Sequence, residues 1–376
     1  MLILWFGQSL ARHKVLGTVG AVRPSCFCLS FSGISAATGS NSNSRTPIEP
    51  LEFTEVLGDV ASNRLRSDRA STEKGQKKDM RFLTAPVLAR DLIVVRKIDE
   101  VRRHVAAARR RGDEIGLVPT MGALHAGHLS LVQTAREECD FLVVSLFVNP
   151  AQFGPHEDYD QYPRPFDSDL DACRDAGVDL VFCPETSSIY PRRFSTFVDV
   201  ERLAKVLEGK FRPGHFRGVA TVVLKLLHIV LPDVAYFGRK DYQQQLLVRT
   251  MCRDLDLPVE IRTCPTVRES DGLALSSRNR YLTPDERKSA ISLSQSLKRA
   301  KARLESGETD LAAVRGAMLD SIQAAPGISV DYATVVHPET LEEIGEPIAE
   351  MIALVAARVG QVRLIDNLPI RLFTVR

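Results

Sequence analysis

Residues 115–132 read IGLVPTMGALHAGHLSLV. The first four residues form a run that is apolar on both faces, which is typical of a strand covered by helices on both sides. Gly122 and Gly127 allow the backbone to turn sharply and to approach a ligand closely. A helix beginning near Gly127 would offer free N–H groups and the positive end of its dipole to a phosphate. The stretch therefore predicts a strand, a loop and a helix, with an anion-binding site at the carboxyl edge of a parallel sheet.

Apolar runs of the same kind recur along the chain. They read LIVV (92–95), FLVVSLFVNP (141–150), VDLVFCP (178–184), VAYFG (234–238) and VEIRTC (259–264). Helical patterns separate them, most clearly from Val219 to Val230, where apolar residues recur at helical spacing. This alternation predicts an α/β fold, with a Rossmann-like, doubly wound parallel sheet over residues 85–266.

The pattern changes after residue 266. The segment TPDE at 283–286 combines a capping box with a proline at the first helical position, so a long helix is expected from there to about Ser306. A second helix is expected over about 310–325. Three strand-like runs follow, ISVDYATVV, MIALVAARV and QVRLIDNL. Residues 267–376 therefore predict a small C-terminal α+β domain that acts as a lid.

Composition narrows the class of protein. The 376 residues are 44% hydrophobic and 26% charged, as in ordinary globular proteins. A net charge of +2 provides no general attraction for nucleic acid or an anionic membrane, and no apolar run reaches the roughly 18 residues of a membrane span. Neither partner is expected. The seven cysteines are odd in number and scattered, which is typical of reduced thiols.

Residues 1–84 predict an N-terminal extension with a different character. Residues 1–48 contain no Asp or Glu, and they carry scattered Arg, Lys and many Ser. Such a start resembles an organellar transit peptide, for example a mitochondrial one. A disordered tail or a misassigned start codon, in a protein that otherwise stays in the cytoplasm, is the alternative. Residues 60–80 are polar without periodicity, which is typical of a linker.

His125 and His128 are the first candidates for chemistry, because they sit at the predicted strand–helix junction. Two histidines at this spacing could hold zinc. Zinc proteases, however, need histidines four residues apart with a glutamate between them, and no third ligand with recognisable spacing is present. The pair is therefore interpreted as phosphate-binding, and metal ligands stay unknown.

Two further segments carry polar groups after strands, and a third lies on the loop between the two domains. In FVNPAQF (147–153), Asn149 and Gln152 can hydrogen-bond a hydroxylated acid, although an Asn-Pro turn alone is a common loop. In FGRKDYQQ (237–244), which follows RPGHFRG (212–218), Lys240 can meet a phosphate. Asp241 can accept from a ribose hydroxyl, help to hold Mg²⁺, or simply cap a helix. The third segment, SSRNR (276–280), can close over a triphosphate or serve as a polar linker.

Five longer strings carry a family resemblance. They are PTMGALHAGHLSLV, FVNPAQF, RPGHFRGVATVVLKLL, KDYQQ and TVRESDGLALSSRNRYL, in this order. Over roughly residues 92–370 the chain resembles the pantothenate synthetase family, pantoate–β-alanine ligases of the nucleotidyltransferase superfamily. The resemblance implies an enzyme that joins pantoate to β-alanine through a pantoyl-adenylate, with ATP as substrate, Mg²⁺ as cofactor and a homodimeric assembly.

The resemblance also implies residue roles. His128 would be the proton donor, with His125, Lys240, Ser277 and Arg278 acting on the phosphates. Gln152 would contact pantoate and β-alanine, and Gln244 pantoate. The expected ATP contacts are Met121, Gly122, Ala123, Leu124, His125, Ala126, Gly127, His128, Gly238, Arg239, Lys240, Asp241, Val267, Leu275, Ser276, Ser277 and Arg278.

The chain departs from the family pattern at three positions. Arg239 stands where bacterial members usually have Glu, and Leu275 replaces a usual Met, which conserves volume. Ser168 replaces the first of two adjacent acids, which puts an acidic metal contact there in doubt. Two alternatives stay open: another adenylating nucleotidyltransferase, such as a tRNA-charging enzyme, and a non-catalytic ATP-binding paralogue.

Overall fold

The computed structural model describes residues 91–155 and 157–372, which belong to one compact unit. The expectations for residues 1–84, including the transit peptide and the linker, lie outside the described residues. Within the described part no helix has both the length and the apolar character needed to cross a bilayer. The five cysteines of this part are all free thiols, as predicted.

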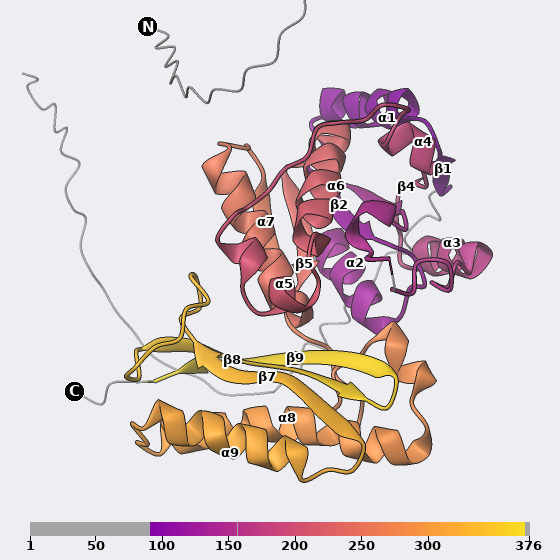
Figure 1. Ribbon diagram of the computed structural model, residues 1–376. Helices are drawn as coiled ribbons and strands as arrows, with labels where there is room; N and C mark the ends of the chain where they lie inside the picture. Colours follow the sequence, from indigo (N-terminus) through magenta and orange to yellow (C-terminus); the bar gives the residue numbers. More distant parts are fainter. Residues whose placement is uncertain (1–90, 156, 373–376) are drawn as a thin grey trace, which may run out of the picture. The chain divides into compact units, whose positions relative to one another are not determined.

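The larger sheet is parallel and six-stranded, in the order β1-β4-β3-β2-β5-β6 (Figure 1). Its strands are β1 (Ile93–Val95), β2 (Ile115–Thr120), β3 (Phe141–Leu146), β4 (Leu180–Phe182), β5 (Val234–Gly238) and β6 (Glu260–Cys264). The chain runs outward from β2 through β3 to β4, and then returns to place β5 on the other side of β2. The crevice beyond the carboxyl ends of β2 and β5 is therefore the topological switch point, where sheets of this kind bind ligands. The predicted Rossmann-like fold is confirmed.

Helices cover both faces of this sheet, because alternate residues of each strand point to opposite sides. Val143 of β3 joins one core with α1 (Ile98–Arg111), α6 (His215–Val230) and α7 (Tyr242–Asp254). Its neighbours Leu142 and Val144 join a second core with α2 (Ala126–Glu138) and α3 (Phe166–Asp175). A strand that is apolar on both faces is what this arrangement requires.

The C-terminal part is the predicted α+β unit. An antiparallel sheet, in the order β7-β8-β9, packs against two helices (Figure 1). The elements are α8 (Pro284–Glu305), α9 (Leu311–Gln323), β7 (Ile328–Val336), β8 (Glu350–Val359) and β9 (Val362–Arg371). The capping box forms as expected: Glu286 Oε2 accepts from Thr283 N at 2.8 Å, and Thr283 Oγ1 accepts from Glu286 N at 3.3 Å. The boundaries at residues 84 and 266 stay predictions.

Short helical segments connect the main elements. They are η1 (Pro150–Gln152), α4 (Thr186–Ile189), η2 (Leu203–Lys205), α5 (Glu208–Phe211), η3 (Arg239–Asp241) and η4 (Ser277–Tyr281). Of these, η1, η3 and η4 follow or face the carboxyl ends of the parallel strands, so they supply side chains to the switch-point crevice.

A buried cluster of ion pairs connects the part of the chain that holds the parallel sheet with the C-terminal part that holds the antiparallel sheet. Arg363 of β9 donates to both oxygens of Glu208, at 2.5 and 2.8 Å, and its Nε donates to Asp331 Oδ2 at 2.7 Å. Tyr332 also donates to Glu208 Oε1, at 2.8 Å. Leaving one partner of such a buried pair alone typically costs about 3–5 kcal/mol, so the cluster fixes how β9 meets α5.

Candidate active site

Two adjoining cavities of about 180 Å³ each lie at the switch point. They have common walls, formed by Pro119, Met121, His128, Tyr162, Phe237, Asp241, Gln244 and Arg278. Because the cavities share these residues, they form one cleft with two halves.

The two halves differ in chemistry. The first half adds a basic and hydroxylated lining, made of His125, Gly127, Gly238, Lys240, Val267, Leu275, Ser276 and Ser277. The second half adds Gln152 and Asn149 together with apolar side chains of α6, among them Val222. The sequence-predicted phosphate-binding residues thus meet in one half. Gln152 and Gln244, the predicted pantoate residues, meet in the other.

His125 has a defined tautomer. It caps α2, and its Nδ1 accepts from Gly127 N at 3.1 Å, so Nε2 must carry the ring proton when the ring is neutral. Burial, and then the charge of Lys240, lower the pKa of His125 below its ordinary value of 6.5. The result is a neutral N–H donor on the wall of the basic half.

His128 stacks on His125, with the ring centroids 4.1 Å apart. Burial, and then His125, lower the pKa of His128 to about 3. Its Nδ1 is buried and has no hydrogen-bond partner among the described residues. A buried polar atom left unpaired is costly, so it marks a position where a ligand atom belongs.

The loop between β2 and α2 is held by Asp169. Both of its oxygens accept backbone N–H groups, from Ala123 at 2.8 Å and from Leu124 at 2.7 Å. Gly122 has a φ of +83°, and a Cβ there would lie 2.9 Å from Asp169 Oδ2, so glycine is required. Asp169 is only 4% exposed. Its carboxylate is therefore engaged by the loop, whatever the neighbouring Ser168 contributes.

Five of the expected ATP contacts do not line the cleft. Besides Arg239, which is described below, these are Gly122, Ala123, Leu124 and Ala126 of the loop before α2 and its first residue. The N–H group of Gly122 is also engaged, since it donates to Thr120 Oγ1 at 3.1 Å. Gly122 and its neighbours shape the loop that presents the two histidines.

The charged side chains of η3 line two different cavities. Lys240 lines the basic half of the cleft, and its Nζ lies 3.8 Å from Asp241 Oδ1. Asp241 occupies the N-cap position of α7 but makes no side-chain cap bond, so its carboxylate is left to the cleft. Arg239 points elsewhere, into a separate groove that it shares with Arg249 and Glu350. The change from the usual Glu to Arg239 therefore leaves the lining of the cleft unaltered.

Arg278 reaches the cleft from the loop that precedes α8. Its Nη2 donates to Asp158 at 3.0 and 3.3 Å, while Nε and Nη1 have no partner among the described residues. Ser276 accepts from Arg278 N at 3.3 Å and so begins η4. Asp158 carries no signal in the sequence that singles it out, because it is one of several acids in a loop without a motif.

Gln152 and Asn149 have different roles. Asn149 uses its whole amide on the protein: Oδ1 accepts from Ala151 N and Tyr190 OH, and Nδ2 donates to Gln152 Oε1 and Gly218 O. Of the two interpretations of Asn149, the structure supports the turn residue, since no donor or acceptor of its amide is spare. Among the described residues, Gln152 Nε2 donates to Met121 Sδ alone, at 3.0 Å, and Gln152 lines the cleft.

The RPGHFRG segment supports Gln152 from behind. His215 Nδ1 lies 2.8 Å from Gln152 O, and Arg212 Nη2 donates to the same carbonyl at 3.4 Å. Arg212 is in turn fixed by both oxygens of Glu157, at 2.7 and 2.6 Å. Burial, and then Arg212, lower the pKa of His215 to about 4, so this ring is neutral. A Cβ on Gly218 would lie 2.1 Å from the carbonyl oxygen of Ala151, which explains the glycine.

No preformed metal centre accompanies the cleft in the part of the chain that the structure describes. Within residues 91–155 and 157–372 no three His, Cys, Asp or Glu side chains converge on a common point. Asp241 is the acidic side chain that lines both halves of the cleft.

The fold and the cleft define an α/β enzyme of the nucleotide-binding class. The family model for pantoate-beta-alanine ligase matches residues 93–369, and the chain belongs to this family. The pantothenate synthetase of Moorella thermoacetica is 52% identical over 274 residues, which cover 73% of this chain and 97% of the relative. That of Acetivibrio thermocellus is 49% identical, with 73% and 98% covered.

Solved structures agree with this assignment. A pantothenate synthetase from Thermus thermophilus superposes with a TM-score of 0.70 at 48% identity, covering 73% of this chain and 98% of that one. A pantoate-beta-alanine ligase from Francisella tularensis, complexed with beta-gamma ATP and beta-alanine, gives 0.61 at 34% identity, with 74% and 97% covered. The predicted family and fold class are confirmed.

Proposed function

We propose that this chain joins pantoate to β-alanine with ATP, through a pantoyl-adenylate, and releases AMP and pyrophosphate. The observation that carries the proposal is the cleft with two halves, a basic half beside an amide-lined half with common walls at His128, Gln244 and Arg278. A triphosphate suits the first half. A small hydroxy acid suits the second, which has amides and no unpaired cation of its own among the described residues.

The chemistry requires activation of the acid. A carboxylate is a poor electrophile, because its charge repels an attacking amine, and transfer of AMP replaces that charge with a leaving group. A pantoate carboxylate oxygen attacks the α-phosphorus, the bond to the β-phosphate oxygen breaks, and pyrophosphate leaves. Negative charge grows on the phosphate oxygens. Lys240, Arg278 and the N–H of His125 are the donors positioned to stabilise it.

The second step needs no covalent intermediate on the protein. The amine of β-alanine attacks the carbonyl carbon of the adenylate, the bond to AMP breaks, and the amine loses a proton. In this scheme the side-chain amide of Gln152 lies next to both reacting groups. The backbone carbonyl oxygen of Gln152 is held by His215 and Arg212. In the first step His128 would supply a hydrogen bond to a phosphate oxygen from a neutral ring, since its pKa of about 3 excludes the imidazolium before ligand binds.

Mg²⁺ fits the residues present. This ion typically takes one or two carboxylates and completes its shell with substrate phosphates and water. Asp241 provides a carboxylate without a cap bond, directly beside Lys240. When bound, Mg²⁺ would neutralise phosphate charge.

A product assay tests the proposal. The protein is incubated with ATP, Mg²⁺, β-alanine and a panel of hydroxy acids, and AMP and pantothenate are measured. Pantothenate and AMP should appear in equal amounts with pantoate and not with the other acids. AMP formation that depends on a different acid would favour another adenylating enzyme, and ATP binding without turnover would favour a non-catalytic paralogue.

The homodimer and the cellular location are further parts of the proposal. We infer a homodimer from membership of the family, and light scattering coupled to gel filtration should give twice the chain mass. A mass of one chain would contradict it.

We also propose that residues 1–84 direct the protein to an organelle. A fluorescent protein fused behind residues 1–84 should then accumulate in an organelle. Diffuse cytoplasmic fluorescence would support the alternative, a protein that stays in the cytoplasm.

A further inference from the structure

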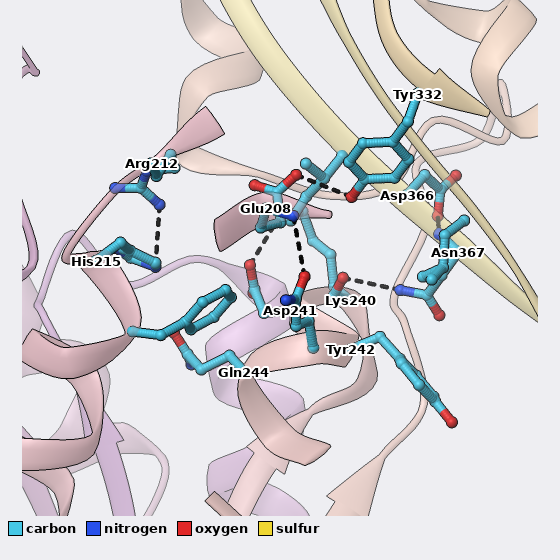
Figure 2. A pocket seen from close by; sticks show the side chains of 14 residues that line it. Glu208, Arg212, His215, Lys240, Asp241, Tyr242, Gln244, Tyr332, Asp366 and Asn367 are labelled. Carbon is cyan, nitrogen blue, oxygen red and sulfur yellow. Dashed lines mark hydrogen bonds and ion pairs between the residues drawn. The ribbon is translucent and has the colours of Figure 1, made fainter. Parts of the chain in front are cut away.

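Two polar residues of the C-terminal sheet are buried where they meet the phosphate-binding segment. Asp366 and Asn367 of β9 are 4% and 2% exposed. Asn367 Nδ2 donates to the carbonyl oxygens of two successive residues, Arg239 at 2.9 Å and Lys240 at 2.8 Å, and Figure 2 shows Asn367 turned toward Lys240. One amide therefore holds the backbone on both sides of the Lys240 α-carbon.

This support matters because η3 is a 3₁₀ segment of only three residues, without a side-chain cap at its start. Segments of three residues in a 3₁₀ turn have poorer hydrogen-bond geometry than an α-helix. Asp241, the N-cap of the following helix, provides no side-chain cap. Asn367 thus supplies, from another domain, the contact that fixes where Lys240 leaves the backbone.

Asp366 fixes Asn367 and also the other phosphate-binding loop. Its two oxygens accept from Arg268 Nη1 at 2.7 Å and Nη2 at 2.9 Å, a bidentate pair, and Oδ1 also accepts from Asn367 N at 2.7 Å. Paired charge-assisted bonds of this kind are strong and directional. Arg268 begins the loop that ends with Ser276 and Arg278. One dipeptide therefore ties both phosphate-binding segments to the same strand.

Neither residue touches the nucleotide half of the cleft. Asp366 and Asn367 line a smaller cavity, of about 40 Å³, to which Lys240 also contributes (Figure 2). Lys240 is shared by this cavity and by the basic half of the cleft. Any effect of Asn367 on ATP must therefore pass through the residues that it holds.

We propose that Asn367 is a positioning residue for Lys240, and that Asp366 sets Asn367 and the Arg268 loop in register. Through this dipeptide the C-terminal domain contributes to ATP binding, although neither residue contacts ATP. The inference rests on the proposed ligase function for its kinetic test, but not for its binding test. A displacement of about 1 Å at a catalytic group can cost up to 10²-fold in rate, which sets the scale of the expected effect.

The first experiment compares Asn367→Ala with Glu208→Gln. Glu208 belongs to the same domain contact and meets Arg363 of the same strand, but it does not bond to η3. Asn367→Ala should lower kcat/KM for ATP by about 10- to 100-fold, with KM for pantoate changed less than about twofold. Glu208→Gln keeps one acceptor for Arg363, which also stays paired with Asp331, so it should change both by less than about threefold. An equal loss of kcat/KM for ATP in both variants would show that Asn367 only holds the domains together, and would overturn the proposal.

A double-mutant cycle tests the route through Lys240. If Asn367 acts through this lysine, then Lys240→Ala with Asn367→Ala should be no worse than Lys240→Ala alone, within about twofold. Fully additive losses would overturn the proposal. Asn367→Ser, which keeps one donor, provides a milder variant if Asn367→Ala does not fold, and its loss should be smaller.

A binding measurement separates the two proposals. Each variant is titrated in a calorimeter with ATP and Mg²⁺, without a second substrate. The double-mutant cycle calculated from the Kd values for ATP should show the same lack of additivity as the kinetic cycle. If the wild-type protein binds ATP but makes no pantothenate, the ligase proposal fails and the cycle in Kd still tests Asn367. If Asn367→Ala makes pantothenate with unchanged kinetics and binds ATP with an unchanged Kd, the positioning role is wrong and the ligase proposal stands.

Discussion

His125 and His128 stack at a centroid distance of 4.1 Å, and both rings are neutral at pH 7 before ligand binds. Two imidazolium ions could not stack at this distance without strong repulsion. The neutral pair instead lines the cleft without charge, and His128 Nδ1 is buried with no partner among the described residues. The positively charged side chains on the wall of the basic half are then Lys240 and Arg278.

The first prediction concerns pH. The ring signals of His128 in the ligand-free protein should not titrate between pH 8 and 5, because its pKa is lowered to about 3. In the unfolded chain the ring takes up a proton near its ordinary pKa of 6.5. The free energy of unfolding should therefore fall as the pH drops from 6.5 toward 3. His128→Asn should reduce this slope. A ring signal with a midpoint near pH 6.5 would contradict the prediction.

The second prediction concerns the basic half of the cleft. Lys240→Ala and His128→Ala should each lower kcat by about 10²–10³, because each removes a donor from a partly dehydrated site. Arg239→Ala is the matched control, since this neighbour of Lys240 faces the separate groove. It should stay within about threefold of the wild-type rate. Rates near wild type for both test variants would mean that the reaction takes place elsewhere.

The third prediction concerns Asp158 and Arg278. Asp158 holds one nitrogen of the guanidinium and leaves two others for phosphate. Asp158→Asn should raise KM for ATP by about threefold to tenfold, because a charged bond of this kind is worth about 1 kcal/mol in a half-exposed position. Asp160→Asn, an exposed acid in the same loop, is the control and should have no effect. An unchanged KM in Asp158→Asn would show that Arg278 finds its place unaided.

The sequence was sufficient for the fold, because apolar runs and helical periodicity are local signals. It also placed His125 and Lys240 at one edge of the sheet, since each follows a parallel strand, while Arg278 joined them only through the family resemblance. Asp169 and Asn367 were not predicted. Each acts on backbone groups 45 or more residues away in the chain, and a carboxylate or amide that binds backbone leaves no pattern in the sequence.

The sequence left two interpretations open for Asn149. Its position after a buried strand, beside Gln152, allowed a substrate contact, and its place before a proline favoured a turn. Whether an amide is spare depends on its neighbours. Tyr190 and Gly218, which are remote in sequence, take up an acceptor and a donor of Asn149.

The last prediction concerns the order of events. If pantoyl-adenylate forms before β-alanine is needed, the enzyme should exchange labelled pyrophosphate into ATP with pantoate alone. The layout favours this order, since the residues that line the two halves enclose a triphosphate and an acid without any group supplied by the amine. Omitting pantoate should abolish exchange, because the attacking oxygen is missing.

Gln152→Ala should slow this exchange by up to about 10²-fold, because it removes the amide that aligns the acid. Gln161→Ala, an exposed amide of the neighbouring loop, is the matched control and should exchange at the wild-type rate. Exchange that strictly required β-alanine would rule out the two-step mechanism in favour of a concerted one. Exchange that an amino acid supported and pantoate did not would instead identify a tRNA-charging type of adenylation.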